Sequence, residues 1–225
     1  MTLSIDKALE TFRDGGFVIV TDDADRENEG DLFLLASAAT TEKIGFMIRY
    51  TSGVICVAMT EERSRQLHLP LMVKQNQDTK RTAFTVTVDA KHEITTGISA
   101  KERANTIRAL ADLSSTAEDF IRPGHIFPLI AHEGGLAARR GHTEAIVEMC
   151  KLVGENQVGV ISELVNEDGS MMRGDNLTRF ASEQGIPILS IAQLMSALEG
   201  SNKVDSQKEF TLNWAELPRS SSGQL

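Results

Sequence analysis

Six carboxylate side chains lie within eleven residues near the start of the chain, between Thr21 and Asp31. They are Asp22, Asp23, Asp25, Glu27, Glu29 and Asp31. Carboxylates this close repel one another unless a cation, a substrate or both offset their charge. The flanking stretches, 17–20 and 32–36, are apolar and have the length of strands, which places the acidic residues in a loop at a sheet edge. The pattern indicates a site for a cation or a substrate, and its alternative is a solvated polar loop.

The acidic loop does not have the form of an EF-hand calcium site. An EF-hand needs a glutamate at the twelfth position of its loop, and a loop that starts at Asp25 has Ala36 there. The zinc motif HExxH is also absent. A motif that starts at His132 would need its second histidine four residues later, and that residue is Leu136. No glycine-rich stretch has the spacing of a P-loop or of a dinucleotide-binding turn. A cation at this loop would therefore need a ligand from elsewhere in the chain.

A second cluster, RRGHT, begins at Arg139 and should open a helix. The apolar residues that follow at helical spacing are Ala145, Ile146, Met149 and Leu152. The free N–H groups and positive dipole end of a helix N-terminus, together with Arg139, Arg140 and the small Gly141, suit a phosphate group. His142 is a candidate cation ligand beside Glu27, although a single histidine is more often structural. The cluster predicts a phosphate site, and its alternative is a capped surface helix with solvated arginines.

Two further side chains lie in apolar strands. Glu163 closes the strand VGVIS, and an ionisable residue at a strand end can face a cleft; its alternative is an exposed strand end. Cys56 lies within the apolar stretch 54–59 and is expected to be a core thiol, because nothing beside it in the sequence would lower its pKa. Cys56 and Cys150 should both be reduced and buried.

Helical and strand-like segments alternate along the chain, which predicts an α/β or α+β fold with one mixed sheet and flanking helices. Strands are expected at 17–20, 32–36, 54–59, 84–88, 126–131, 158–163 and 187–191. Helices should begin at Thr41, Thr60 and Ser99, with a further capping box from Ser115 to Glu118. Residues 122–125, RPGH, are expected to form a turn. A single domain should cover residues 1–200, and a polar tail covers 201–225.

Composition and charge narrow the classes of function. The 225 residues are 41% hydrophobic and 24% charged, which is typical of globular proteins. A net charge of −9 disfavours a general nucleic-acid or anionic-membrane surface. No stretch of about 18 apolar residues is present, and the N-terminal residues have an amphipathic helical pattern in place of a signal peptide. We expect a cytoplasmic protein that binds neither nucleic acid nor membrane.

Six segments, in this order and spacing, resemble the 3,4-dihydroxy-2-butanone 4-phosphate synthase family of riboflavin biosynthesis. They are DDADRENEGDL, SGVICVAMT, TTGISAKER, RPGHIFPL, RRGHTEA and ELVNEDGSM. The resemblance covers residues 5–198, and RENEGD and GHTEA are its most specific parts. It implies an α/β fold, a homodimer with active sites at the subunit interface, and magnesium as cofactor with manganese as a substitute. The implied reaction converts ribulose 5-phosphate to 3,4-dihydroxy-2-butanone 4-phosphate and formate.

The resemblance also implies roles for individual residues. Glu27 and His142 match the metal ligands. The matches to substrate-contacting or catalytic positions are Arg26, Glu27, Asp31, Arg139, Gly141, His142, Thr143 and Glu163, with Glu29 and Cys56 as further active-site residues. His125 matches a histidine that is expected to reach the neighbouring subunit's site, and Thr95 or Thr96 matches a threonine near it. Arg140 stands where many members have glycine, and it adds a positive charge beside the phosphate.

The implied reaction accounts for the kinds of side chain present. Removing a proton next to a ketone, expelling a hydroxyl, moving the carbon skeleton and releasing formate need several acid–base groups and a Lewis acid. A magnesium ion held by only two protein groups leaves positions for substrate oxygens. The rival hypotheses are another magnesium-dependent sugar-phosphate isomerase or aldolase, and a non-catalytic protein that binds a cation or a phosphometabolite.

Overall fold

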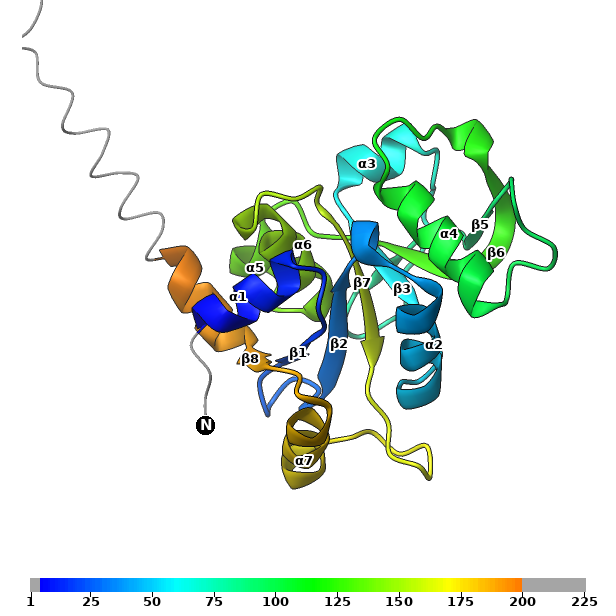
Figure 1. Cartoon of the computed structure of the whole chain (residues 1–225). Helices are drawn as coiled ribbons and strands as arrows, with labels where there is room; N and C mark the ends of the chain where they lie inside the picture. The colour runs from blue at the N-terminus through cyan, green and yellow to red at the C-terminus, as the bar shows by residue number, and fades with distance from the viewer. Residues whose placement is uncertain (1–4, 200–225) are drawn as a thin grey trace, which may run out of the picture.

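Eight strands form one mixed sheet at the centre of the computed structural model, which describes residues 5–199 (Figure 1). The strands are β1 (Val18–Thr21), β2 (Gly30–Leu35), β3 (Cys56–Met59), β4 (Ala83–Phe84), β5 (Val88–Ala90), β6 (Phe120–Ile130), β7 (Val158–Glu163) and β8 (Ile188–Ser190). Their order is β4-β6-β3-β7-β2-β1-β8, and β5 pairs with β6 beside this path. The pairs β1/β8 and β3/β6 are parallel and the others are antiparallel. The predicted mixed sheet is confirmed.

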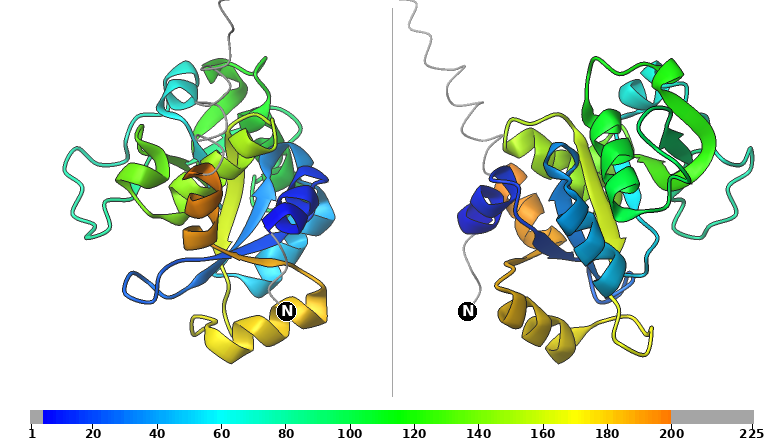
Figure 2. Two further views of the ribbon diagram at one scale, coloured as in Figure 1. Left: turned by 90° about the vertical axis from the view of Figure 1, so that its left-hand side faces the viewer. Right: turned by 45° about the vertical axis from the view of Figure 1, so that its right-hand side comes forward.

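Helices cover both faces of the sheet (Figures 1 and 2). The helices are α1 (Ile5–Arg13), α2 (Thr41–Tyr50), α3 (Glu61–Gln66), α4 (Ala100–Ala111), α5 (Gly135–Ala138), α6 (His142–Leu152), α7 (Gly174–Gln184) and a last one at 191–199, with short 3-10 turns at Ala36–Ala38 and Ala117–Asp119. Helices α1, α5 and α6 lie on one side of the sheet, and α2 and α4 lie on the other. No helix within residues 5–199 has the length and apolarity needed to cross a membrane.

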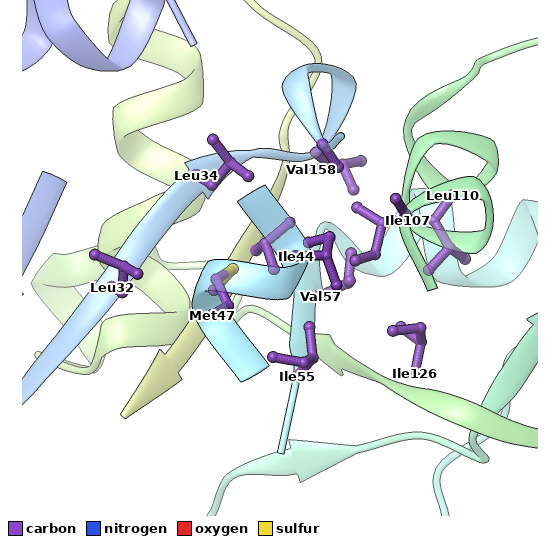
Figure 3. Close-up of a cluster of buried hydrophobic side chains, with 14 of the residues drawn as sticks. Leu32, Leu34, Ile44, Met47, Ile55, Val57, Ile107, Leu110, Ile126 and Val158 are labelled. Atoms are coloured by element: carbon purple, nitrogen blue, oxygen red, sulfur yellow. The ribbon is translucent and has the colours of Figure 1, made fainter. Parts of the chain in front are cut away.

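The core is divided by the sheet into two apolar clusters. Alternate residues of β2 belong to opposite clusters, because successive side chains of a strand point to opposite faces. Leu32 and Leu34 pack with the α2 and α4 residues Ile44 and Ile107 (Figure 3). Phe33 belongs to the other cluster, on the α6 side. Because both faces of the central strands are buried, these strands are held in place, and the polar residues at their ends have defined positions.

Helix starts follow the predicted capping residues closely. The Thr60 and Ser99 hydroxyls accept hydrogen bonds from N–H groups three residues later, as predicted. At α2 the cap is Thr40 instead of Thr41, because Thr40 has the extended backbone of a cap and accepts from the Lys43 N–H. The box predicted from Ser115 to Glu118 is formed one residue later, at 116–119. These errors of one residue reflect adjacent hydroxyl residues with the same capping ability.

Strand β6 differs most from the sequence prediction. The segment 122–125, predicted as a turn, lies within it. The pairing of β5 with β6 shifts register here: Val88 pairs with Ile126 and Asp89 pairs with Ile121, so residues 122–125 lie between two successive pairs. The His125 N–H donates to Asp89 Oδ1 (2.8 Å), so a carboxylate oxygen accepts this hydrogen bond in place of a backbone carbonyl of the neighbouring strand. A Cβ on Gly124 would lie 2.0 Å from the Val88 carbonyl carbon, so this glycine allows the close backbone approach.

The predicted strand 84–88 is divided into two strands. Ala83 and Phe84 of β4 pair with the end of β6, and β5 pairs with the earlier part of β6. Between them, the Thr85 N–H donates to the Pro128 carbonyl (3.0 Å). The segment predicted as one strand therefore forms two short strands, which pair with different parts of β6.

Candidate active site

The acidic loop and the RRGHT cluster meet at a small cavity of about 100 Å³ beside the paired ends of β2 and β7. Eight residues proposed from the sequence line it: Arg26, Glu27, Asp31, Cys56, Arg139, His142, Thr143 and Glu163. The remaining lining residues are Thr82, Phe84, Leu129, Ile161 and Ser162. Five of the proposed residues are not among them: Glu29, Thr95, His125, Arg140 and Gly141. The chain therefore gathers most, but not all, of the proposed site in one place.

Asp22 organises the loop that carries Glu27. Its Oδ2 accepts from Arg26 Nη1 (3.0 Å) and from the Glu27 N–H (3.0 Å), and its Oδ1 accepts from the Glu29 N–H (2.9 Å). Burial acts to raise the pKa of Asp22, but the hydrogen bonds from the Glu29 N–H and Arg26 outweigh it, and the pKa lies below its ordinary value. Arg26 Nη1 also donates to Glu27 Oε2 (2.6 Å). The chain itself thus compensates part of the loop's negative charge.

Asp31 and Glu163 lie opposite each other in the β2/β7 pair. Cross-strand partners have side chains on the same face, so two carboxylates face one cavity. Asp31 is 4% exposed, and its Oδ1 has no hydrogen-bond partner within residues 5–199. Burial raises the pKa of Asp31 well above its ordinary value, and the Glu163 and Glu27 carboxylates raise it further. Asp31 is therefore a carboxyl group that retains its proton more strongly than a free aspartate.

Glu163 is tied to the turn that follows α2. Its Oε2 accepts from the Ser52 hydroxyl (2.7 Å), and the Ser52 N–H donates to its carbonyl (2.8 Å). Cys56 lies on the same face of the neighbouring strand and is 5% exposed. Burial raises the pKa of the Cys56 thiol well above its ordinary value, and the Glu163 carboxylate adds to the effect. Cys56 is a neutral thiol, which agrees with its interpretation as a core residue.

His142 is the first residue of α6 and is buried against Phe33, with ring centroids 6.0 Å apart. Burial lowers the pKa of His142 to about 4, so its ring is neutral at neutral pH. Its Nδ1 lies 3.5 Å from Asp31 Oδ1, and its buried Nε2 has no hydrogen-bond partner in the part of the chain that the structure describes. A neutral ring with an unpartnered nitrogen has the form that a metal ligand requires. With the Glu27 carboxylate lining the same cavity, these residues fit a divalent cation.

Arg139 lies immediately before α6, and the structure fixes its guanidinium with three hydrogen bonds. Nη1 donates to Glu144 Oε2 (2.5 Å), Nη2 to the Thr82 hydroxyl (3.0 Å) and Nε to the Lys80 carbonyl (3.1 Å). Thr143 is buried in the first turn of α6, where backbone N–H groups are free for an anion. The predicted phosphate site is thus a positively charged side chain beside a helix N-terminus.

Two residues of these clusters, Arg140 and Glu29, do not line the cavity. Arg140 is exposed, so its charge is presented to solvent near Arg139. The Glu29 carboxylate pairs with Arg173 Nη2 (2.7 Å), and Arg173 Nε donates to the Asn28 carbonyl (2.9 Å). Burial raises the pKa of Glu29, although Arg173 opposes the shift. In this structure Glu29 helps to bind the acidic loop to the start of α7.

His125 and Thr95 form a separate group on the α4 side, where β5 and β6 lie together in Figure 1. His125 Nδ1 lies 2.7 Å from Asp89 Oδ2, and Asp89 is buried on β5. Thr95 donates from its N–H (2.5 Å) and its hydroxyl (2.7 Å) to Glu102 Oε1. A Cβ on Gly97 would lie 2.9 Å from His125 Nδ1, so the loop of Thr95 approaches His125 closely. Neither predicted residue lines the cavity of its own chain.

Sequence reasoning missed Ser52, Lys80, Thr82, Glu144 and Arg173, all of which contact the proposed residues. Lys80 and Thr82 lie in the polar stretch before the predicted strand 84–88, and the Lys80 ammonium donates to the Arg26 carbonyl (2.7 Å). Glu144 lies within the RRGHTEA segment, five residues from Arg139. No local pattern marks the other four residues, because their contacts join distant parts of the chain.

Comparisons with known proteins agree with this geometry. A model of the 3,4-dihydroxy-2-butanone 4-phosphate synthases matches residues 6–197. The synthase of Candida albicans is 51% identical over 192 residues, which cover 85% of this chain and 94% of that protein. The bifunctional riboflavin biosynthesis protein RIBA 1 of Arabidopsis thaliana is 53% identical over 194 residues, which cover 85% of this chain and 36% of that protein. This chain therefore matches about a third of the bifunctional relative's length.

Solved structures of 3,4-dihydroxy-2-butanone 4-phosphate synthases are also similar to this chain. A crystal structure of 3,4-dihydroxy-2-butanone 4-phosphate synthase in complex with two magnesium ions has a TM-score of 0.86 and 44% identity, covering 89% of this chain and 98% of that one. The cation-free form of a synthase has a TM-score of 0.83 and 42% identity, covering 90% and 100%. With a family match over most of its length and this cavity, the chain belongs to the 3,4-dihydroxy-2-butanone 4-phosphate synthase family.

Proposed function

We propose that the chain converts D-ribulose 5-phosphate to L-3,4-dihydroxy-2-butanone 4-phosphate and formate, a step of riboflavin biosynthesis. The observation that carries this proposal is the meeting of Asp31, Glu163, Glu27 and His142 with Arg139 around one cavity in a member of this family. The reaction needs proton transfer at several substrate atoms, and Asp31 and Glu163 supply two carboxyl groups side by side.

The proposed cofactor is magnesium, with manganese as a substitute, held by Glu27 and His142. The unpartnered His142 Nε2 and the Glu27 carboxylate support this assignment, as does the relative whose structure contains magnesium ions. No group of three or more His, Cys, Asp or Glu side chains is arranged as a metal site within residues 5–199, so substrate or water would complete the shell. The ion supplies a Lewis acid that polarises the substrate's oxygens.

The substrate phosphate is proposed to bind Arg139, Thr143 and the N-terminus of α6 beside Gly141, with Arg26 and Arg140 adding positive charge nearby. Charge-assisted hydrogen bonds from a guanidinium and free backbone N–H groups favour a phosphate dianion at this position. The sugar carbons would then extend toward Asp31 and Glu163, because these residues line the same cavity. Glu29 and Cys56 are proposed to shape the site through charge and packing.

We further propose a homodimer in which His125 and Thr95 complete the cavity of the neighbouring subunit. Their separation from their own chain's cavity supports this arrangement. Ile98 and Ile121 are 50% and 44% exposed. Ile98 follows Gly97, which lies close to His125. Ile121 pairs with Asp89, whose carboxylate contacts the His125 ring. Exposed apolar side chains therefore lie on both sides of this histidine. Exposed apolar side chains around a catalytic candidate suit a subunit contact.

Incubation with ribulose 5-phosphate and magnesium, assayed for formate, tests the proposed function. The synthase should release formate in step with substrate loss. Another magnesium-dependent isomerase or aldolase would form a product without formate, and a protein that only binds cations or phosphometabolites would show no turnover. Either result would overturn the proposal.

A domain boundary near residue 200 and a cytoplasmic location are also proposed. The family model ends at residue 197, and the tail 201–225 lies outside the described residues. Deleting residues 201–225 should leave formate release and cooperative melting unchanged, because the described core contains the whole cavity. A matched variant that ends at residue 190 should lose stability, since it removes the buried Ile191 and Leu194. Loss of activity in the first deletion would show that the tail is part of the enzyme.

A further inference from the structure

We infer that Glu144 is a positioning residue that holds the Arg139 guanidinium in the orientation that binds the substrate phosphate. The inference rests on the proposed function of Arg139 and goes beyond it, because Glu144 itself does not line the small cavity. Glu144 acts through Arg139 and does not touch the reacting atoms.

Glu144 uses both of its carboxylate oxygens within the chain. It is 1% exposed in the first turn of α6. Its Oε2 accepts from Arg139 Nη1 (2.5 Å), and its Oε1 accepts from the His132 N–H (3.0 Å). A carboxylate removed from water needs such partners, and the second bond prevents it from turning away from the first. Glu144 is therefore a rigid acceptor.

The contacts of Arg139 leave a specific part of its guanidinium available. An arginine has five N–H groups, and three of them are used by Glu144, Thr82 and the Lys80 carbonyl. Within residues 5–199, one N–H on Nη1 and one on Nη2 are left without a hydrogen bond. N–H groups on the terminal nitrogens can donate to phosphate oxygens. The three protein contacts thus fix the guanidinium and leave both terminal nitrogens able to donate to a phosphate.

Gly141 makes room for this ion pair. A Cβ at Gly141 would lie 2.2 Å from Arg139 Nη1 and 2.9 Å from Glu144 Oε2. The φ of Gly141 is −111°, which other residues adopt readily, so the requirement is for space. Because the nearest atom is the end of a flexible side chain, an added methyl group should displace the guanidinium instead of unfolding the helix. Gly141→Ala is therefore an independent way to disturb the same arrangement.

A double-mutant cycle tests the inference. KM and kcat for ribulose 5-phosphate, and the inhibition constant for inorganic phosphate, are measured for wild type, Arg139→Ala, Glu144→Gln and the double variant at saturating magnesium. Glu144→Gln should raise KM and the phosphate inhibition constant together by about tenfold, with kcat nearly unchanged, since a charged hydrogen bond that orients the anion site is lost. In the Arg139→Ala background, Glu144→Gln should have no further effect on KM.

Glu148→Gln is the matched control, because Glu148 lies one turn later on α6 and, like Glu144, lines a cavity of about 310 Å³ whose lining does not include Arg139. It should leave KM unchanged. If Glu144→Gln raises KM equally with and without Arg139, or leaves KM unchanged, Glu144 does not position this arginine. If Glu144→Gln fails to fold, KM is measured for Gly141→Ala instead. An unchanged KM in folded Gly141→Ala protein would overturn the inference. An unchanged KM in Arg139→Ala alone would instead contradict the proposed phosphate site.

Discussion

The unpartnered nitrogen of His142 is the residue-scale feature that most directly predicts a measurable property. Because burial keeps the ring neutral and Glu27 faces the same cavity, one divalent cation should need both residues. Glu27→Gln and His142→Ala should each reduce formate release by at least about 100-fold while melting stays cooperative. Manganese binding, followed by electron paramagnetic resonance, should weaken in parallel.

The matched control for these variants is Asp23→Asn, which removes a carboxylate from the same loop that does not line the cavity. It should retain manganese binding and turnover. Near wild-type activity of Glu27→Gln or His142→Ala at saturating magnesium would remove that residue from the metal site.

At the scale of elements, the loop 91–99 is attached to α4 through Glu102. This side chain accepts from the Thr95 N–H, the Thr95 hydroxyl and the Ser99 hydroxyl. The hydrogen bonds from Thr95, followed by those from Ser99, lower the pKa of Glu102 from 4.5 to about 2. A lowered carboxyl pKa stabilises the folded state fully above the ordinary value, and the contribution disappears as pH falls toward the lowered value. The stabilisation should therefore be lost between about pH 4.5 and 2.

Glu102→Gln should consequently lower the melting temperature at pH 7, and its difference from wild type should shrink progressively below pH 4.5. Thermal melts followed by circular dichroism across this range measure the effect. Glu118→Gln, which removes the same charge from an exposed position, should have a small and nearly constant effect. A Glu102→Gln difference that stays constant down to pH 2 would contradict the role of the ionised carboxylate.

At the scale of the whole molecule, the separation of His125 from Glu163 predicts complementation between subunits. His125→Ala and Glu163→Gln should each be inactive alone. In a mixed dimer, one site would combine the intact Glu163 of one chain with the intact His125 of the other, so equal mixing should recover about a quarter of wild-type activity. Formate release after subunit exchange measures the recovery.

Asp31→Asn mixed with Glu163→Gln is the control for this experiment. Asp31 and Glu163 line one cavity of one chain, so no mixed dimer contains an intact pair and no recovery is expected. If His125→Ala and Glu163→Gln also fail to complement after verified exchange, the site is built by a single chain.

The sequence by itself determined the elements and the chemical character of the site. Helix periodicity, the caps at Thr60 and Ser99 and the acidic loop between two strands depend on residues close together in the chain, so they can be predicted locally. The motifs also predicted eight of the cavity residues through their family resemblance. The predicted cap of α2 was one residue late, because Thr40 and Thr41 offer equivalent local choices. The single strand predicted at 84–88 was wrong, because its pairing with β6 is not continuous.

Only the tertiary structure decided which distant residues meet. The pairing of β2 with β7 places Asp31 opposite Glu163, and this register is set by burial of both faces of the sheet. The contacts of Arg139 with Lys80 and Thr82 likewise depend on packing of a loop against the start of α6. Local propensities act over a few residues, whereas register and side-chain contact between distant segments are fixed by close packing of the whole core.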